Sequence, residues 1–273
     1  MTTEEVRVER SGGVSNLRSA SAVVGIVLWV AFSAPPLLTW ARRYEFVQAL
    51  QYCFFAFWIP VLITVGAPLR FLGPTLAVDS KESALAPSSS PRSGLLASLV
   101  LARSRVDSQR RAIVVGFVFV FLEIFWRMSG VVDVSVQHPW LLVVESLTLV
   151  SVGVAFMSDL VESPPLRPGT TRPFRIGASA IAMWTVWVVA YLNGMSGHSW
   201  YSVFHYVAGR GISQVADHQL STASMLVITG SVFVPIVFWN LMHWLQAEEN
   251  PDDELYHLVR QERKLGFFGS RRP

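Results

Sequence analysis

The sequence predicts an all-α membrane protein, a bundle of six transmembrane helices with both chain ends in the cytoplasm. Hydrophobic residues make up 52% of the chain and charged residues only 15%, whereas about a quarter of a soluble domain is charged. The apolar residues also gather into six stretches, and a helical span needs ~20 mostly apolar residues. A third observation, the distribution of Lys and Arg between the two sides, agrees with this topology.

The six candidate spans cover residues 22–40, 47–71, 112–128, 139–157, 176–195 and 220–245. Each is expected to be helical, because hydrocarbon offers the backbone of an isolated span no other hydrogen-bond partners. The first span is interpreted as a retained helix and not as a signal peptide, because Phe32 breaks the small-residue pattern before Ala34. Pro60 and Pro235 hint at irregular helices in the second and sixth spans.

Orientation follows from the 22 Lys and Arg residues. With the N-terminus in the cytoplasm, 18 of them fall on the cytoplasmic side and only Arg42, Arg43, Arg127 and Arg210 on the other side. Cytoplasmic loops of membrane proteins carry such an excess. These basic residues flank apolar spans, where anionic lipid headgroups attract them. The high pI therefore indicates contact with membrane lipids, and no nucleic-acid partner is expected.

One membrane domain, residues 20–246, is expected between a cytoplasmic N-terminal segment, 1–19, and a cytoplasmic tail, 247–273. Its main interruption is a polar cytoplasmic loop at 73–111. Within this loop, the leucine-rich stretch at 95–101 precedes several arginines and is typical of an amphipathic helix on the membrane surface. The single cysteine, Cys53, excludes an internal disulfide framework.

Polar side chains within the spans gather toward the non-cytoplasmic ends. Ionisable groups in a bilayer cost about 2.5 kcal/mol or more on insertion scales, so they should face the bundle interior or water. Glu123 and Arg127 are four residues apart and could pair on one helical face, and Glu145 should find Arg127 or donors from other spans. We therefore expect a polar outer pocket made of Gln48, Gln51, Tyr52, Glu123, Arg127, Glu145, Asp217 and Gln219. The alternative is a hydrogen-bonded network that only fixes helix packing.

The same side of the membrane offers candidate metal ligands. Copper and zinc sites require several converging imidazole, thiolate or carboxylate donors. His218, Glu145 and His205 are the candidates, although no HxxxH pair or other tight ligand spacing occurs. Walker, GxGxxG, GxSxG and HExxH motifs are also absent from the sequence, so none of the corresponding enzyme classes is indicated.

Three segments, in order and spacing, resemble the CtaG family of cytochrome c oxidase assembly proteins. The second span begins Gln48-Ala49-Leu50-Gln51-Tyr52 and ends Gly66-Ala67-Pro68-Leu69, where the family has a His-Met-x-Gln-His start and a Gly-Ala-Pro-Leu end. Trp126, Asp133, Pro139 and Glu145 follow, and the sixth span opens Asp217-His218-Gln219-Leu220 and reaches Met225. Pro35-Pro36 in the first span also fits. The resemblance covers roughly residues 22–246, and the family usually has one further span.

The departures concern histidines, which are the natural copper ligands of that family. Histidines of the family pattern are replaced here by Gln48, Tyr52, Arg127, Leu142 and Ser146, whereas Gln51, Asp133, Glu145, Asp217 and Gln219 are retained. Gln and Tyr are poor copper ligands, and an arginine offers only N–H donors. The resemblance thus implies a divergent member with a degenerate copper site, in which Arg127 neutralises Glu145 or Glu123 in place of a metal.

The resemblance further implies an assembly factor for a haem-copper oxidase in the bacterial cytoplasmic membrane. It would act as a scaffold that contacts oxidase subunits, not as an enzyme. No cofactor is established, and copper is the metal that the resemblance suggests. Two other functions stay open. A small-solute or metal transporter would use Glu145 and Asp217 as its polar pathway, and an intramembrane enzyme would use Asp217, His218 and Glu145 as acid and base groups.

Overall fold

The structure is a computed structural model that describes residues 16–66, 108–161, 170–205, 209 and 211–249. All regular elements within these ranges are helices. The amphipathic helix predicted at 95–101 lies outside the described residues, as do most of the predicted N-terminal segment, cytoplasmic loop and tail. A few residues of these predicted segments are described, and they are helical. The first helix starts at residue 16, the helix after the predicted loop starts at residue 108, and the last helix continues to residue 249.

The helices follow one another along the chain with few interruptions. They are α1 (Asn16–Ser33), α2 (Pro35–Ala41), α3 (Glu45–Cys53), the π-helix η1 (Phe54–Trp58), α4 (Ile59–Val65), α7 (Ser108–Phe125), α8 (Ser129–Gln137), α9 (Pro139–Leu160), α10 (Arg172–Met195), the 3-10 helix η2 (Ser202–Phe204) and α11 (Gln214–Glu249). Four spans, namely α3 to α4 taken together, α9, α10 and α11, are long and apolar enough to cross a membrane. The number rises to six when each of two bent helix pairs is one span. The all-helical membrane fold is confirmed.

Two of the predicted spans are bent near one end. The axes of α1 and α2 differ by 59°, and those of α7 and α8 by 72°. The first bend falls at Pro35-Pro36, because Pro36 has no N–H to donate to the carbonyl of Phe32. The second bend falls at Met128, whose backbone is extended. The third span was predicted to run straight to residue 128, but α7 ends at Phe125 and α8 turns across the end of the bundle.

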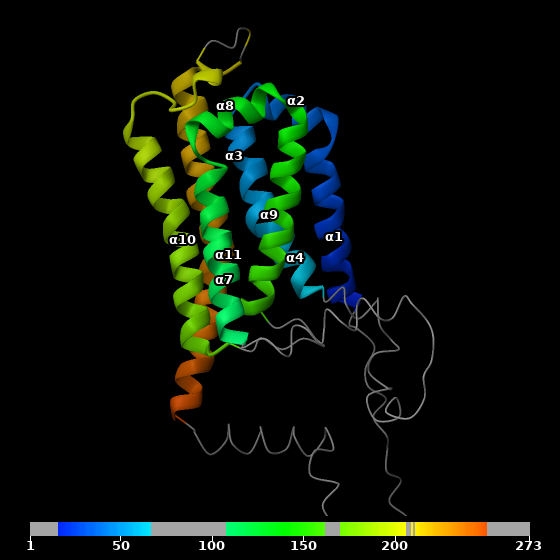
Figure 1. Cartoon of the computed structure of the whole chain (residues 1–273), viewed down its shortest axis with the longest axis vertical. Helices are drawn as coiled ribbons and strands as arrows, with labels where there is room; N and C mark the ends of the chain where they lie inside the picture. Colours follow the sequence, from blue (N-terminus) through cyan, green and yellow to red (C-terminus); the bar gives the residue numbers. More distant parts are fainter. Residues whose placement is uncertain (1–15, 67–107, 162–169, 206–208, 210, 250–273) are drawn as a thin grey trace, which may run out of the picture.

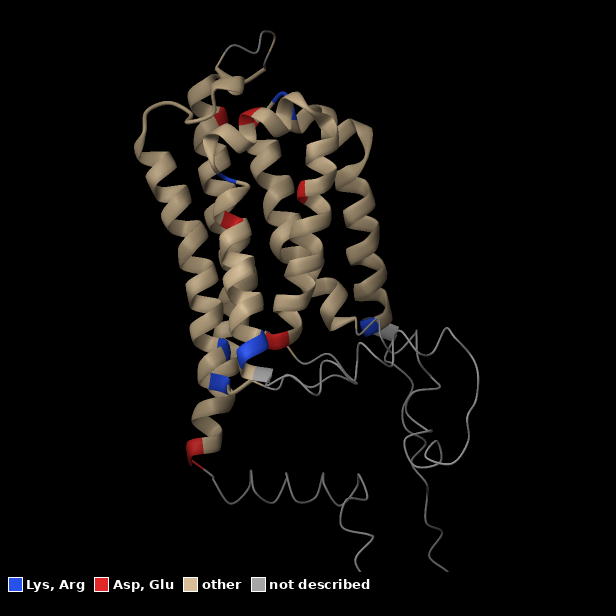
Figure 2. Ribbon diagram, viewed as in Figure 1, with Lys and Arg blue, Asp and Glu red and all other residues tan. Residues whose placement is uncertain are grey.

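The two ends of the bundle differ in character. The short helices α2 and α8 and the connection between α10 and α11 lie at one end, called the α8 end here (Figure 1). α1, α7 and α10 start at the opposite end, where their first turns bring arginines together (Figure 2). There Arg111 pairs with Asp159 at the end of α9, and Arg172 Nη1 donates to the carbonyl of His243, 2.6 Å away. These contacts tie α7 to α9 and α10 to α11.

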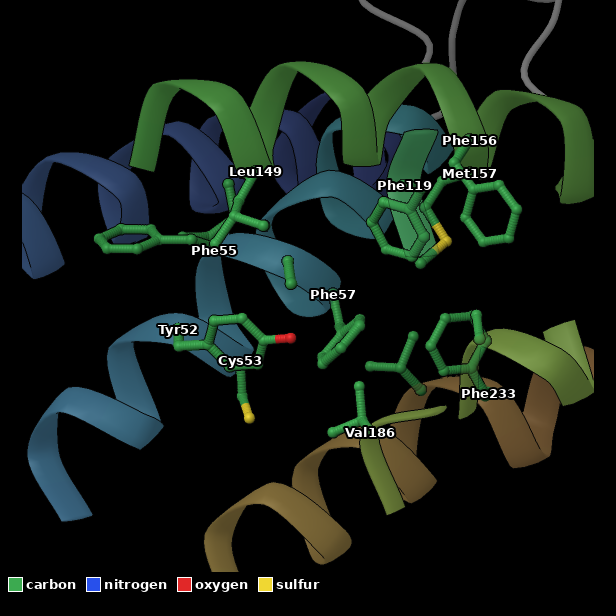
Figure 3. Close-up of a cluster of buried hydrophobic side chains, with 14 of the residues drawn as sticks. Tyr52, Cys53, Phe55, Phe57, Phe119, Leu149, Phe156, Met157, Val186 and Phe233 are labelled. Carbon is green, nitrogen blue, oxygen red and sulfur yellow. The ribbon is translucent and has the colours of Figure 1, made fainter. Parts of the chain in front are cut away.

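An aromatic core fills the middle of the bundle (Figure 3). The ring of Phe57 in η1 meets those of Phe119 and Phe233 edge-on, with centroids 6.2 and 5.4 Å apart, and Phe119 stacks on Phe156 at 4.4 Å. The wide turn of η1 precedes Pro60, which has no N–H for the usual helical hydrogen bond. η1, α7, α9 and α11 are thus packed around one apolar layer.

Gly153 allows α9 to approach η1 and α4 closely. A Cβ atom there would lie 2.6 Å from Cγ of Pro60 and 3.0 Å from the carbonyl oxygen of Ala56. Gly177 in α10 is a matched control, because a Cβ atom there would meet nothing within 4 Å. Gly153→Ala is expected to destabilise the protein by about 1–3 kcal/mol through overpacking, measured as a lower Tm in detergent. Gly177→Ala should leave the Tm unchanged or slightly higher; equal effects of both changes would contradict this packing.

Candidate functional site

A buried arginine lies at the centre of the α8 end. Arg127, in the turn between α7 and α8, is 3% exposed. Its guanidinium carbon lies 5.4 Å from the ring centre of Tyr52 and 4.9 Å from that of Tyr201, and Nη1 donates to Oε1 of Gln48. Aromatic faces attract a cation most strongly when water is excluded. Gln48, Tyr52, Arg127 and Tyr201, called the Arg127 cluster here, therefore hold a positive charge inside the bundle.

The connection between α10 and α11 covers this cluster. Tyr201 is fully buried, and its hydroxyl donates to the carbonyl of Arg127, 3.3 Å away. Burial raises the pKa of the Tyr201 phenol, so the hydroxyl keeps its proton and remains a donor. Asp133 of α8 anchors the next residues: it accepts hydrogen bonds from the Ser202 hydroxyl at 2.7 Å and from the N–H of Val203 at 3.0 Å. The connection between α10 and α11 thus covers the Arg127 cluster at the α8 end.

The carboxyl groups near this cluster do not bond directly to Arg127. Among the described residues, no ion pair joins Arg127 to Glu123 or Glu145, and both oxygens of Glu123 and Oε2 of Glu145 are buried without a hydrogen-bond partner. The predicted pairing of Glu123 with Arg127 is therefore wrong. It required a continuous helix, but α7 ends at Phe125, and the N–H of Arg127 bonds to the carbonyl of Ile124 in a tighter turn.

A second buried polar group lies where α3 begins. Asp217 accepts hydrogen bonds from the N–H groups of Glu45 and Phe46, both at 3.0 Å, and so caps the free donors of the first turn of α3. The neighbouring His218 has Nδ1 3.0 Å from Oε1 of Glu45 and Nε2 3.0 Å from the carbonyl oxygen of Asn193. These contacts fasten α3, α10 and α11 to one another.

The remaining predicted pocket residues lie apart from the cluster. Nε2 of Gln51 donates to the carbonyl of Phe32, 2.8 Å away, which is the carbonyl that Pro36 cannot serve. Gln219 is exposed on α11. Seven of the eight predicted residues are buried. Gln48, Tyr52 and Arg127 belong to the Arg127 cluster, Asp217 caps α3 and Gln51 bonds at the bend of α1, so the polar outer pocket stays a prediction.

The three candidate metal ligands are not brought together. No group of three or more His, Cys, Asp or Glu side chains in the described part of the chain is placed to hold a metal ion. Both ring nitrogens of His218 face acceptors within the protein. Nε2 of His205 lies 2.9 Å from the carbonyl oxygen of Ser199. A metal site at these residues stays a prediction.

Sequence reasoning missed two residues of the site. Glu45 pairs with His218 across 173 positions of the chain, and its only signal is an acidic residue directly before the second predicted span. Tyr201 covers Arg127 from a loop 74 positions away. No spacing rule connects a loop tyrosine to a distant arginine, so the sequence by itself offered no signal for this contact.

Arg127→Met, which removes the charge, should lower the Tm more than Arg127→Lys, which keeps it. Arg127→Met leaves Oε1 of Gln48 without its donor, which costs about 1–3 kcal/mol, and removes the cation–π contacts with both tyrosine rings. Arg127→Lys keeps the charge but loses the planar contact with both tyrosine rings, so its Tm in detergent should fall between wild type and Arg127→Met. The exposed Arg43 gives the control, Arg43→Met, with little change. A wild-type Tm for Arg127→Met would contradict the stabilising role of the cluster.

Comparison with known proteins was made for the whole chain. A family model described as cytochrome c oxidase caa3 assembly factor (Caa3_CtaG) matches residues 4–247. That range contains all the residues of the Arg127 cluster and of the cap of α3, and nearly all of the described helices. No curated protein and no solved structure matches the chain at a significant level.

Proposed function

The chain belongs to the Caa3_CtaG family of cytochrome c oxidase caa3 assembly factors, and we propose that it is a scaffold in the maturation of a haem-copper oxidase. In this proposal it holds an oxidase subunit during assembly and does not deliver copper. It lies in the bacterial cytoplasmic membrane with both chain ends in the cytoplasm. Its α8 end then faces the outside, where the client subunit is held.

The Arg127 cluster carries this proposal. Three positions at which the family pattern has histidines, those of Gln48, Tyr52 and Arg127, are in mutual contact here around a guanidinium. A guanidinium has no lone pair to offer a metal, and its permanent charge repels a second cation in a low-dielectric interior. Copper therefore does not fit among these residues, and the arginine supplies the positive charge in its place.

The residues that match the family pattern also support a scaffold role, because they bond to the backbone of other helices. The side chains of Gln51, Asp133 and Asp217 all bond to backbone groups at helix ends or bends. Backbone groups inside a membrane must find partners within the protein, so these residues maintain the architecture whether or not a metal is bound. The chain thus combines the family's architectural residues with an altered centre.

The distribution of charge and tryptophan supports the proposed orientation. Basic residues at the starts of α7 and α10 gather at the end opposite α8 (Figure 2), and positive charge favours the cytoplasmic side. Trp40, Trp140 and Trp200 are exposed at the α8 end. Tryptophan is enriched where a membrane meets water, so these three side chains fit the outer interface.

Copper analysis tests the degenerate site. The purified wild-type chain, loaded with Cu(I) and desalted, is expected to retain far less than one copper per chain, because the Arg127 cluster offers no suitable ligands. Restoring the family pattern with Gln48→His, Tyr52→His and Arg127→His together should raise the bound copper toward stoichiometry. Stoichiometric copper in the wild type that disappears in Glu145→Ala/His218→Ala would instead mean a rebuilt metal site, and the copper-free scaffold would be wrong.

Co-purification tests the partner. The tagged chain, extracted in mild detergent from cells that are assembling their oxidase, should bring an oxidase subunit with it, and cells lacking the chain should contain less active oxidase. Absence of every oxidase subunit from the purified material, together with unchanged oxidase activity in the deletion strain, would refute the scaffold proposal irrespective of the copper result.

A further inference from the structure

Four arginines gather at the end of the bundle opposite α8. They come from the first turns of α7 and α10, which contact each other and both start at this end (Figure 2). They are called the arginine patch here: Arg110, Arg111, Arg172 and Arg175. Neither first turn contains an acidic residue. Asp159 pairs with Arg111, so positive charge exceeds negative charge among the described residues of α7, α9 and α10 at this end.

A chain of polar contacts brings the arginines of the two helices to one place. Asp159 at the end of α9 pairs with Arg111 through its side chain, and its carbonyl accepts from the Thr170 hydroxyl at 2.8 Å. The carbonyl of Thr170 in turn accepts from Nη2 of Arg175, 2.8 Å away. A guanidinium carries five N–H groups, so these contacts hold the arginines in position and the same side chains can still share an anion.

An apolar stripe continues from the patch along the outer side of α7. Ile113, Phe117 and Phe121 follow Arg110 at intervals of three or four residues and therefore lie on one helical face with it. All four side chains are exposed, and Phe117, at 74%, has the largest exposed fraction of the large hydrophobic side chains in the described part of the chain. A phospholipid has the same order of parts, a charged headgroup followed by apolar chains. A soluble phosphate compound would use the arginines alone.

We propose that the arginine patch binds the phosphate of an anionic phospholipid, whose acyl chains lie along the apolar stripe of α7. Basic sites between transmembrane helices bind such headgroups. Arginine suits a phosphate because its planar N–H groups can bond two oxygens at once. Since the guanidiniums come from both α7 and α10, the bound lipid would hold the starts of these helices together. The inference does not depend on the oxidase role.

Native mass spectrometry of the purified, delipidated protein in detergent tests the selectivity of the patch. Phosphatidylglycerol and phosphatidylcholine with the same acyl chains are titrated separately, and the apparent Kd of the first bound lipid is compared. Phosphatidylglycerol is expected to bind about tenfold more tightly, because its headgroup has no cation to offset the phosphate. Equal affinities would overturn the proposal. Glycerol phosphate, which lacks acyl chains, should displace the lipid only at much higher concentration; displacement at equal concentration would mean that a soluble phosphate is the ligand and would overturn the lipid site.

A matched pair of variants separates this site from general attraction to the positive end of the bundle. Arg110→Gln and Arg18→Gln each remove one charge at this end, but Arg18 belongs to α1, on the far side of the bundle from α10 (Figure 1). Arg110→Gln is expected to weaken the first phosphatidylglycerol about fivefold, whereas Arg18→Gln should leave it unchanged. Equal weakening by both changes would overturn the site.

A second pair of variants tests the apolar stripe and also serves if Arg110→Gln does not fold. Phe117→Ala should weaken phosphatidylglycerol several-fold, because it removes exposed apolar surface beside the proposed chains. Val227→Ala on α11, where the side chain is 68% exposed, is the control and should have no effect on the first bound lipid. Equal affinities in these two variants would show that the lipid does not lie along α7 and would overturn the proposal.

Discussion

The permanent charge of Arg127 is the constraint on which the α8 end depends. A charge inside a helix bundle is costly unless neighbouring groups compensate it, and here two tyrosine rings and Gln48 do so. Tyr201 reaches Arg127 only because the connection between α10 and α11 folds inward, and Asp133 of α8 holds that connection. α8 can lie there only because α7 ends early. One buried cation thus links the course of α7, α8 and the loop that covers them.

The irregular points of the helices are made possible by side chains from other helices. Each interruption frees backbone groups that a membrane interior cannot hydrate. Gln51 satisfies the carbonyl at the bend of α1, Asp217 the first N–H groups of α3, and Asp133 those of η2. Polar residues in these spans therefore serve two purposes. Some complete the backbone at helix ends, and others surround Arg127. The first kind bonds to backbone groups at helix ends and bends, whereas the second contacts the guanidinium of Arg127.

The polar centre of the α8 end lies next to an aromatic layer of the bundle. At the α8 end, buried acids, amides and tyrosines surround a cation. On the side of Phe57 away from Tyr52, its ring packs against those of Phe119 and Phe233, and Phe119 stacks on Phe156 (Figure 3). An aromatic layer with a polar end that is closed by a loop suits a protein that presents one shaped end to a partner.

The sequence by itself determined the membrane class, the all-helical fold and the family, because hydropathy and ordered motifs are local properties of the chain. It also identified Gln48, Tyr52 and Arg127 as members of one polar group. Only the tertiary structure decided which groups meet. Glu123 and Arg127 were expected to pair from their spacing, but the end of α7 separates them, while Glu45 and Tyr201 reach the site from distant segments. The reason is physical: a helix period relates side chains within one element, whereas contacts between elements depend on bends and packing that no single span encodes.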